Sequence, residues 1–350
     1  MNTNLSQRLE RSINKMIASN QIHEAVVFVE NTNGEFSFSK GYGGKGIDSP
    51  LLMASITKML TTTCILILKE QGRLSLDDKI MKYFDNSVME GLHVYKGKEY
   101  SFKLTLSDLL YQISGLPDIY EEGSNSYKNR LINEDCSYTL LESIGATQKL
   151  SPHFAPRTTK RAYYADINFD ILGEIIEKIT NQSLSNAYSH YIFEALGLKN
   201  TYLPESENDF VPVIYNGDEA IYRPKFVISS KGSGGCITTA REMMIFLKAF
   251  FGGGLFDISI LNELSLFNKL QAAMWPICYG SGYMRIPLGG LTTFFKAKGE
   301  LKGHSSSTGS FAFYYPNKDL YITGDLNQMK KPALPIKLSI QIAMMIKEKF

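Results

Sequence analysis

Segments with the pattern of β-strands lie near both ends of this chain, whereas the residues between them are mainly helical in pattern. Apolar or alternating stretches at 25–29 and 35–39 flank an Asn-Gly turn signal, and two more at 310–315 and 320–326 flank a Pro-Asn turn. Strands bury their apolar faces only when they pair and pack. The sequence therefore predicts one sheet built from both ends of the chain, with a mainly helical region inserted between them.

The chain has 350 residues, a length that suits two domains or one large composite domain. We expect a discontinuous sheet domain formed by residues 1–75 and 230–350, and a mainly helical domain formed by residues 76–229. The active site is expected in the cleft between the two. Hydrophobic residues make up 44% of the chain and charged residues 21%, which is typical of a globular protein and excludes a disordered one.

Apolar residues recur at helical spacing in several segments. The spacing predicts helices over residues 5–17, 55–71, 167–180, 240–251 and 336–349. The segment at 55–71 is apolar on nearly every side and is followed directly by a glycine, which often ends a helix. A helix that is apolar all round is usually buried, so we expect this one in the core.

Charge and composition exclude several classes of function. The 37 basic and 35 acidic residues leave a net charge of 37 − 35 = +2, and no long basic run is present, which argues against a nucleic-acid partner. The sequence has no run of about 18 apolar residues and no apolar secretory core at its start. We therefore expect no membrane contact and a cytoplasmic location, unless the natural N-terminus has been trimmed. The four cysteines and five histidines show no metal-ligand spacing, so we expect no metal and no cofactor.

The tetrapeptide Ser-x-x-Lys occurs three times, at residues 12–15, 37–40 and 55–58. The first lies on a polar, solvated helix face. The second lies in a predicted strand, where residues three apart point to opposite faces. Only Ser55 and Lys58 open an apolar helix, where residues three apart share a face.

The placement of Ser55 and Lys58 suits nucleophilic catalysis. A serine hydroxyl is a weak nucleophile until a base takes its proton, and a partly desolvated lysine can act as that base. The N-terminal end of the helix would favour developing negative charge. In the alternative interpretation, Ser55 only caps the helix and Lys58 extends to solvent.

Two further segments change the balance between these interpretations. Residues 162–180, AYYADINFDILGEIIEKIT, resemble the second motif and following helix of the penicillin-recognising serine hydrolases, which include class C β-lactamases, DD-carboxypeptidases and related esterases. Residues 302–328, which include the tripeptide HSS at 304–306, resemble the third motif and its hairpin. Segments 74–84, 104–120 and 233–250 add support. SITK, YAD and HSS occur in the family's order, so the resemblance covers nearly the whole chain.

The resemblance implies a fold and roles for individual residues. The implied fold is the β-lactamase/transpeptidase-like α+β fold, an antiparallel sheet flanked by helices. Ser55 would be the acylated nucleophile and Lys58 its base, and Tyr164 would carry the proton to the leaving group and help to activate the deacylating water. The backbone N–H groups of Ser55 and Ser307 would form the oxyanion hole, and His304 would steer the substrate.

The chain departs from the family pattern at several substrate-binding positions. Asp166 replaces the usual Asn, and an ionised carboxylate accepts hydrogen bonds but cannot donate one. Asp166 could bind Lys58 or a cationic substrate group, such as a free α-amine. His304 replaces the lysine of class C enzymes and is only partly charged at neutral pH. Ser306 replaces a Gly and would point toward or away from the cleft. The expected substrate-binding residues are Asp166, His304, Ser305, Ser306 and Ser307.

These observations predict a serine hydrolase that works through an acyl-enzyme on small esters, amides or D-amino-acid peptides. Its partner would be a small-molecule or peptide substrate; the sequence indicates no oligomeric state. Three alternatives remain open. A β-lactamase would use the same nucleophile, but this chain lacks the carboxamide donor and the lysine that such an enzyme carries. A DD-carboxypeptidase would need export. A non-catalytic binding protein on the same fold would not need Ser55, Lys58 and Tyr164.

Overall fold

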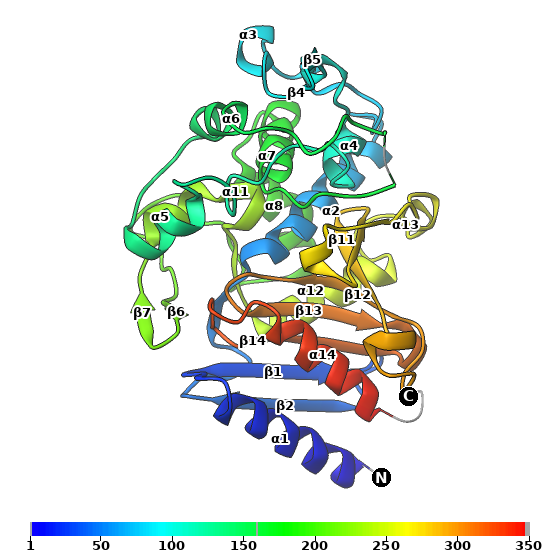
Figure 1. Ribbon diagram of the computed structural model, residues 1–350. Helices are drawn as coiled ribbons and strands as arrows, with labels where there is room; N and C mark the ends of the chain where they lie inside the picture. The colour runs from blue at the N-terminus through cyan, green and yellow to red at the C-terminus, as the bar shows by residue number, and fades with distance from the viewer. Residues whose placement is uncertain (1, 159, 347–350) are drawn as a thin grey trace.

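The computed structural model describes residues 2–158 and 160–346. Its centre is an eight-stranded antiparallel sheet with the order β2-β1-β14-β13-β12-β11-β10-β9 (Figure 1). The strands are β1 (Ala25–Glu30), β2 (Ser37–Tyr42), β9 (Asn268–Lys269), β10 (Cys278–Gly280), β11 (Tyr283–Pro287), β12 (Glu300–Ser305), β13 (Ser310–Tyr315) and β14 (Leu320–Asp325).

Strands from the two ends of the chain lie side by side in this sheet. β1 pairs antiparallel with β14, with Val27 opposite Gly324. A Cβ atom at Gly324 would lie 2.1 Å from the carbonyl oxygen of Val26, so this close pairing requires glycine. The first five residues of β1 are all buried, which is typical of a strand covered on both faces. The predicted sheet from both ends of the chain is therefore confirmed.

Helices cover both faces of the sheet. α1 (Asn2–Ala18) and α14 (Leu334–Met345) pack against each other on one face, and α12 (Ala240–Gly252) packs on the other against β1, β13 and β14 (Figure 1). A sheet flanked by helices in this way matches the predicted α+β fold class.

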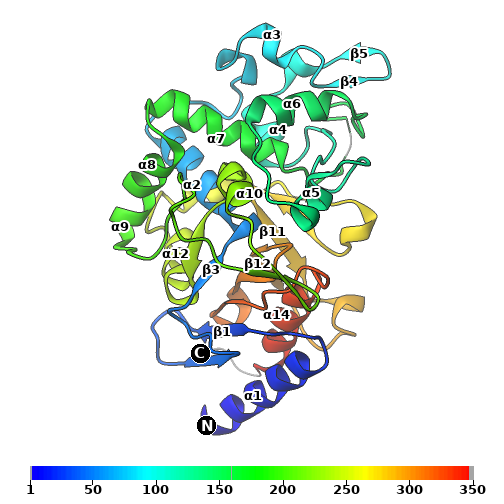
Figure 2. The same cartoon turned by 90° about the vertical axis from the view of Figure 1, so that its left-hand side faces the viewer.

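The remaining helices gather at one end of the molecule around the central helix α2 (Thr57–Glu70) (Figure 2). Every residue of α2 from Thr57 to Leu68 is buried, as its apolar sequence predicts. Its neighbours include α7 (Ile167–Thr180), α8 (Leu184–Tyr188) and α11 (Lys231–Gly234). The other helices are α3 (Asn86–Met89), α4 (Leu106–Leu110), α5 (Tyr127–Asn133), α6 (Leu140–Gln148), α9 (Glu194–Leu196), α10 (Pro224–Ser229) and α13 (Ser259–Glu263).

The other described strands form three two-stranded pairs. They are β3 (Pro50–Leu52) with β8 (Ile237–Thr239), β4 (Val94–Tyr95) with β5 (Lys98–Glu99), and β6 (Ile214–Asn216) with β7 (Glu219–Ile221). The β3–β8 pair connects the helical end to the sheet end, because β3 leads into α2 and β8 leads into α12.

A few predicted boundaries shift. The strand expected at 35–39 begins at Ser37, and the terminal helix expected at 336–349 spans Leu334–Met345, with residues 347–350 outside the described part of the chain. No helix among the described residues is long and apolar enough to span a bilayer. The division into two domains at about residues 75 and 230 stays a prediction.

Candidate active site

Ser55 lies in a single 3₁₀ turn, Ala54–Ile56, that joins β3 to α2. Ala54 has a φ of 42°, a conformation that residues other than glycine rarely adopt and that clusters at functional sites. Tertiary contacts hold the segment before it, because Met53 N donates to Cys236 O at 2.8 Å and the Ser310 hydroxyl donates to Leu52 O. The turn thus presents Ser55 from a fixed backbone.

Lys58 is fully buried one helical turn after Ser55. Its Nζ lies 2.7 Å from Asp166 Oδ1, 2.6 Å from Ser233 O and 3.4 Å from Ser55 Oγ. The carboxylate and the carbonyl only accept hydrogen bonds, whereas the Ser55 hydroxyl can also donate one. The structure therefore excludes a solvent-exposed Lys58, and neither Ser55 nor Ile56 caps the helix with its side chain.

Tyr164 lies just before α7, with its ring 5.1 Å from Lys58 Nζ. The Tyr164 hydroxyl is buried and, among the described residues, makes no hydrogen bond of good geometry. Burial raises the pKa of Tyr164 well above its ordinary value, Asp166 raises it further, and the nearby Ser55 hydroxyl lowers it in part. Tyr164 therefore carries its proton at neutral pH beside both Ser55 and Lys58.

His304 lies on β12 and is fully buried. Its Nδ1 is 2.7 Å from Ser305 O, so Nδ1 carries the hydrogen and the buried Nε2 keeps its lone pair. Burial lowers the pKa of His304 to about 3, and the charge of Lys58 contributes to this shift. The ring is 5.9 Å from the Tyr164 ring. His304 is therefore neutral, where the sequence suggested a partly charged residue.

The three serines after His304 take different positions. Ser305 contributes its carbonyl oxygen to the His304 ring. Ser306 Oγ accepts a hydrogen bond of 2.9 Å from Ser310 N, so this side chain points into the hairpin turn. Ser307 borders a cavity, where its Oγ lies 3.3 Å from the Tyr120 hydroxyl. Ser307 alone of the three is placed to meet a ligand.

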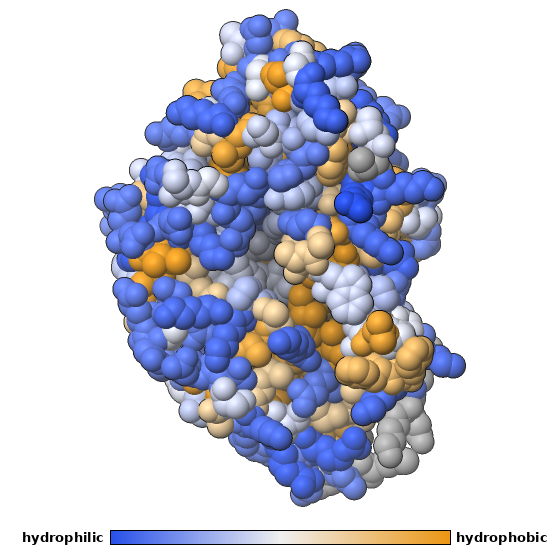
Figure 3. All heavy atoms as spheres, in the orientation of Figure 1, coloured by the Kyte–Doolittle hydropathy of each residue, from blue (hydrophilic) through white to orange (hydrophobic). Residues whose placement is uncertain are grey.

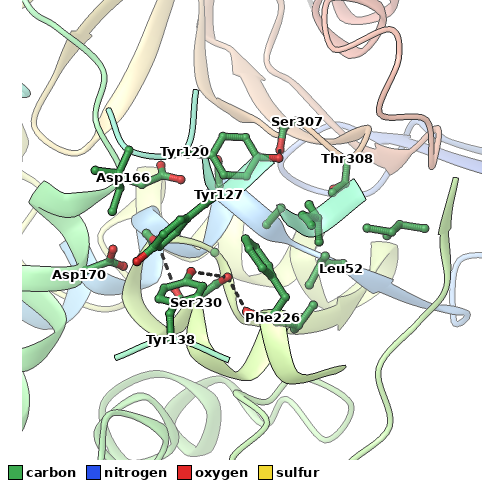
Figure 4. Close-up of a pocket in the computed structure, with 18 residues that line it drawn as sticks. Leu52, Tyr120, Tyr127, Tyr138, Asp166, Asp170, Phe226, Ser230, Ser307 and Thr308 are labelled. Carbon is green, nitrogen blue, oxygen red and sulfur yellow. Dashed lines mark hydrogen bonds between the residues drawn. The ribbon is translucent and has the colours of Figure 1, made fainter. Parts of the chain in front are cut away.

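This cavity has a volume of about 40 Å³ and lies between the helical end and the sheet end, where the surface is hollowed (Figures 3 and 4). Ser55, Asp166 and Ser307 all border it. The other predicted site residues do not border it. They are Lys58, Tyr164, His304, Ser305 and Ser306.

Two acidic residues near Asp166 were not among the predicted site residues. Asp118 is buried, and its Oδ1 accepts hydrogen bonds from Asp166 N and Tyr120 N, each 3.2 Å long. Burial and the charge of Asp166 raise the pKa of Asp118 well above its ordinary value. Asp170 also borders the cavity. Asp170 follows Asp166 by four residues at the start of a predicted helix. This spacing indicates that the two side chains share a face, and it could have identified Asp170.

The family follows from comparison with known proteins. The sequence profile of the β-lactamase family matches residues 9–343. The chain belongs to this family. The prediction of a β-lactamase-related serine hydrolase is thereby confirmed at the level of the family.

Individual relatives are distant. Protein flp of Staphylococcus aureus strain MW2 is 27% identical over 230 residues, which cover 62% of this chain but only 43% of that protein. The chain thus spans less than half the length of this relative.

Solved structures share the fold. A D-stereospecific amidohydrolase from Streptomyces sp. superposes with a TM-score of 0.76 at 22% identity, covering 94% of this chain and 95% of that one. The D-amino acid amidase from Ochrobactrum anthropi SV3, in complex with L-phenylalanine amide, gives 0.77 at 18% identity, with 97% and 98% covered. These neighbours confirm the β-lactamase/transpeptidase-like fold.

Proposed function

We propose that this protein hydrolyses small amides and esters through an acyl-enzyme on Ser55, with amino-acid amides, above all those of D-amino acids, as its preferred substrates. The geometry of Lys58 carries this proposal. A neutral lysine amine has two N–H groups and one lone pair. Lys58 Nζ donates to the Ser233 carbonyl at 2.6 Å and lies 2.7 Å from Asp166 Oδ1, so both contacts hold the nitrogen in place. The Ser55 hydroxyl lies 3.4 Å from the same nitrogen, where a neutral amine can accept its proton.

Acylation would proceed as follows. Ser55 Oγ attacks the substrate carbonyl and passes its proton to neutral Lys58, while the backbone N–H groups of Ser55 and Ser307 bind the oxyanion. Tyr164 donates its proton to the leaving nitrogen as the C–N bond breaks, and Lys58 returns a proton to Tyr164.

Deacylation reverses this order. Water attacks the acyl group and gives its proton to the Lys58–Tyr164 pair, and the Ser55 oxygen leaves with a proton. The neutral ring of His304 lies 5.9 Å from the Tyr164 ring, and we propose that His304 helps to orient Tyr164 instead of steering the substrate.

The charge around the cavity supports amino-acid amides over β-lactams. Asp118, Asp166 and Asp170 lie close to a single lysine, and neutral His304 adds no positive charge. A β-lactam carries a carboxylate for which this site offers no cation other than Lys58, whereas an amino-acid amide carries an ammonium group that acidic side chains can bind. The names of the structural neighbours, a D-stereospecific amidohydrolase and a D-amino acid amidase, favour the same substrate class.

A panel of substrates tests the proposal. The wild-type protein should hydrolyse alanine and phenylalanine amides faster than benzylpenicillin or nitrocefin, and the D-amides faster than the L-amides. Ser55→Ala should abolish all turnover, whereas Ser37→Ala, in another Ser-x-x-Lys tetrapeptide but on β2, should retain it. Turnover of nitrocefin above that of every amide would favour a β-lactamase. Equal activity of Ser55→Ala and wild type would contradict the assignment of the nucleophile.

A further inference from the structure

Beyond Ser55, the cavity has a wall of aromatic residues around one carboxylate. Asp170 of α7 borders the cavity together with Tyr127, Tyr138 and Phe226 (Figure 4). The Tyr127 and Tyr138 ring centroids are 4.3 Å apart, and those of Tyr138 and Phe226 are 5.3 Å apart. Because the three rings pack against one another, they form a continuous aromatic surface beside Asp170.

The tyrosine hydroxyls on this wall bind other residues. Tyr127 OH lies 3.1 Å from Ser143 Oγ, and Tyr138 OH lies 3.0 Å from Ser230 Oγ. Asp170 Oδ1 is buried and, among the described residues, accepts no hydrogen bond of good geometry, although nearby Ser233 lowers the pKa of Asp170 in part. The carboxylate therefore faces the rings with an acceptor atom unsatisfied.

No cation in the described part of the chain forms an ion pair with Asp170. Lys58 forms its ion pair with Asp166, at 2.7 Å, and donates a hydrogen bond to the Ser233 carbonyl. Lys231, which borders a neighbouring cavity with Asp170, lies 3.4 Å from Glu177 instead. A buried carboxylate without a counter-ion is unfavourable in the free protein, and a positively charged ligand would relieve that cost.

The chemistry of the wall selects the ligand. Aromatic faces attract cations, and a carboxylate accepts charge-assisted hydrogen bonds from them. The cavity volume of about 40 Å³ exceeds the roughly 10–15 Å³ that one water needs, yet it is small, so it suits a compact group. A primary ammonium group is compact and has three donors.

We propose that Asp170 and the aromatic wall of Tyr127, Tyr138 and Phe226 form a subsite that binds the primary ammonium group of the substrate's acyl part. This inference rests on the proposed acylation of Ser55, which borders the same cavity. It assigns to Asp170 the cation recognition that the sequence suggested for Asp166, because Asp166 already pairs with Lys58.

A matched pair of substrates tests the subsite. D-Alanine p-nitroanilide and isobutyryl p-nitroanilide differ only in an ammonium group that replaces a methyl group. At pH 8, wild type should show a kcat/KM at least about 10-fold higher for the alanine substrate. Asp170→Asn should lower kcat/KM for this substrate by about 10- to 100-fold, the range of one charge-assisted hydrogen bond, and change the neutral substrate less than twofold.

Two controls separate recognition from folding. Asp77→Asn removes an equal charge from an exposed position and should change kcat/KM for neither substrate. In wild type, n-butylamine should inhibit hydrolysis of p-nitrophenyl acetate at a concentration at least about 10-fold lower than n-butanol does, because only the amine carries the charge.

The outcomes distinguish the inference from the proposed function. Three results would overturn the subsite alone, provided that a fluorophosphonate labels Ser55. They are an equal loss of kcat/KM for both substrates in Asp170→Asn, equal inhibition by the amine and the alcohol, and no preference of the wild type for the cationic substrate. Failure of that labelling would overturn the proposed function instead.

Discussion

Replacing Asp170 with Asn should stabilise the protein, and the gain should depend on pH. Burial raises the pKa of Asp170 from 3.8 to about 7, and Asp166 adds to this shift while a hydrogen bond with Ser233 and the charge of Lys58 oppose it. The folded protein thus favours protonated Asp170. The contribution of protonated Asp170 to the free energy of unfolding is fully present below pH 3.8 and is lost as the pH rises to about 7.

The magnitude follows from the shift. About three pKa units at about 1.36 kcal/mol each correspond to about 4 kcal/mol, an upper figure because local relaxation reduces it. Asn at this position has no charge to bury. The free energy of unfolding of Asp170→Asn, relative to wild type, should therefore rise between pH 4 and pH 7 by about 1–4 kcal/mol and then stay constant.

Urea denaturation of both proteins at pH 4, 5.5, 7 and 8 measures this difference. Both proteins contain the other ionisable groups near Asp170, so the direct contributions of these groups largely cancel. They are Asp166, Lys58, Tyr127, Tyr138, Glu174 and Lys231. Burial keeps the pKa of each tyrosine above its ordinary value of 10.0, so neither ionises in this range. A difference that does not change with pH would refute the reasoning, and Asp77→Asn should show no pH-dependent gain.

Three further substitutions test the catalytic residues. Lys58→Ala should lower the rate of amide hydrolysis by at least about 100-fold, whereas Lys15→Ala, in the tetrapeptide on α1, should not. Tyr164→Phe should slow deacylation more than acylation, so that a burst precedes slow turnover in stopped-flow records; turnover at the wild-type rate would assign Tyr164 to packing. Asp166→Asn removes the carboxylate that favours the charged form of the amine beside it, so the rising limb of the pH–rate profile should move to lower pH. Acylation by penicillin should also improve. An unchanged profile together with an unchanged ranking of substrates would show that Asp166 has only a structural role.

The parts of the site that the sequence predicted depend on local geometry. Ser55 and Lys58 share a face because they are three residues apart on a helix, and the apolar sequence of that helix indicated that Lys58 would be buried. The strand patterns near both ends likewise predicted the sheet, since β1 pairs with β14.

The parts that the sequence did not predict depend on contacts between distant segments. The neutral state of His304 follows from complete burial next to Lys58, which sits on another element. The direction of Ser306 follows from its hydrogen bond to Ser310 across the hairpin. The proposed role of Asp170 depends on the rings of Tyr138 and Phe226, which border the same cavity but come from other segments of the chain. None of these contacts has a signature in the local sequence.

Trapping of the acyl-enzyme tests the central claim most directly. The protein should be mixed with a fluorophosphonate and, separately, with a slowly hydrolysed D-alanine ester, quenched in acid, and examined by intact-mass and peptide mass spectrometry. The account predicts one adduct per chain in each case, located on Ser55 and absent from Ser55→Ala. Labelling at another residue, or unchanged labelling of Ser55→Ala, would contradict it.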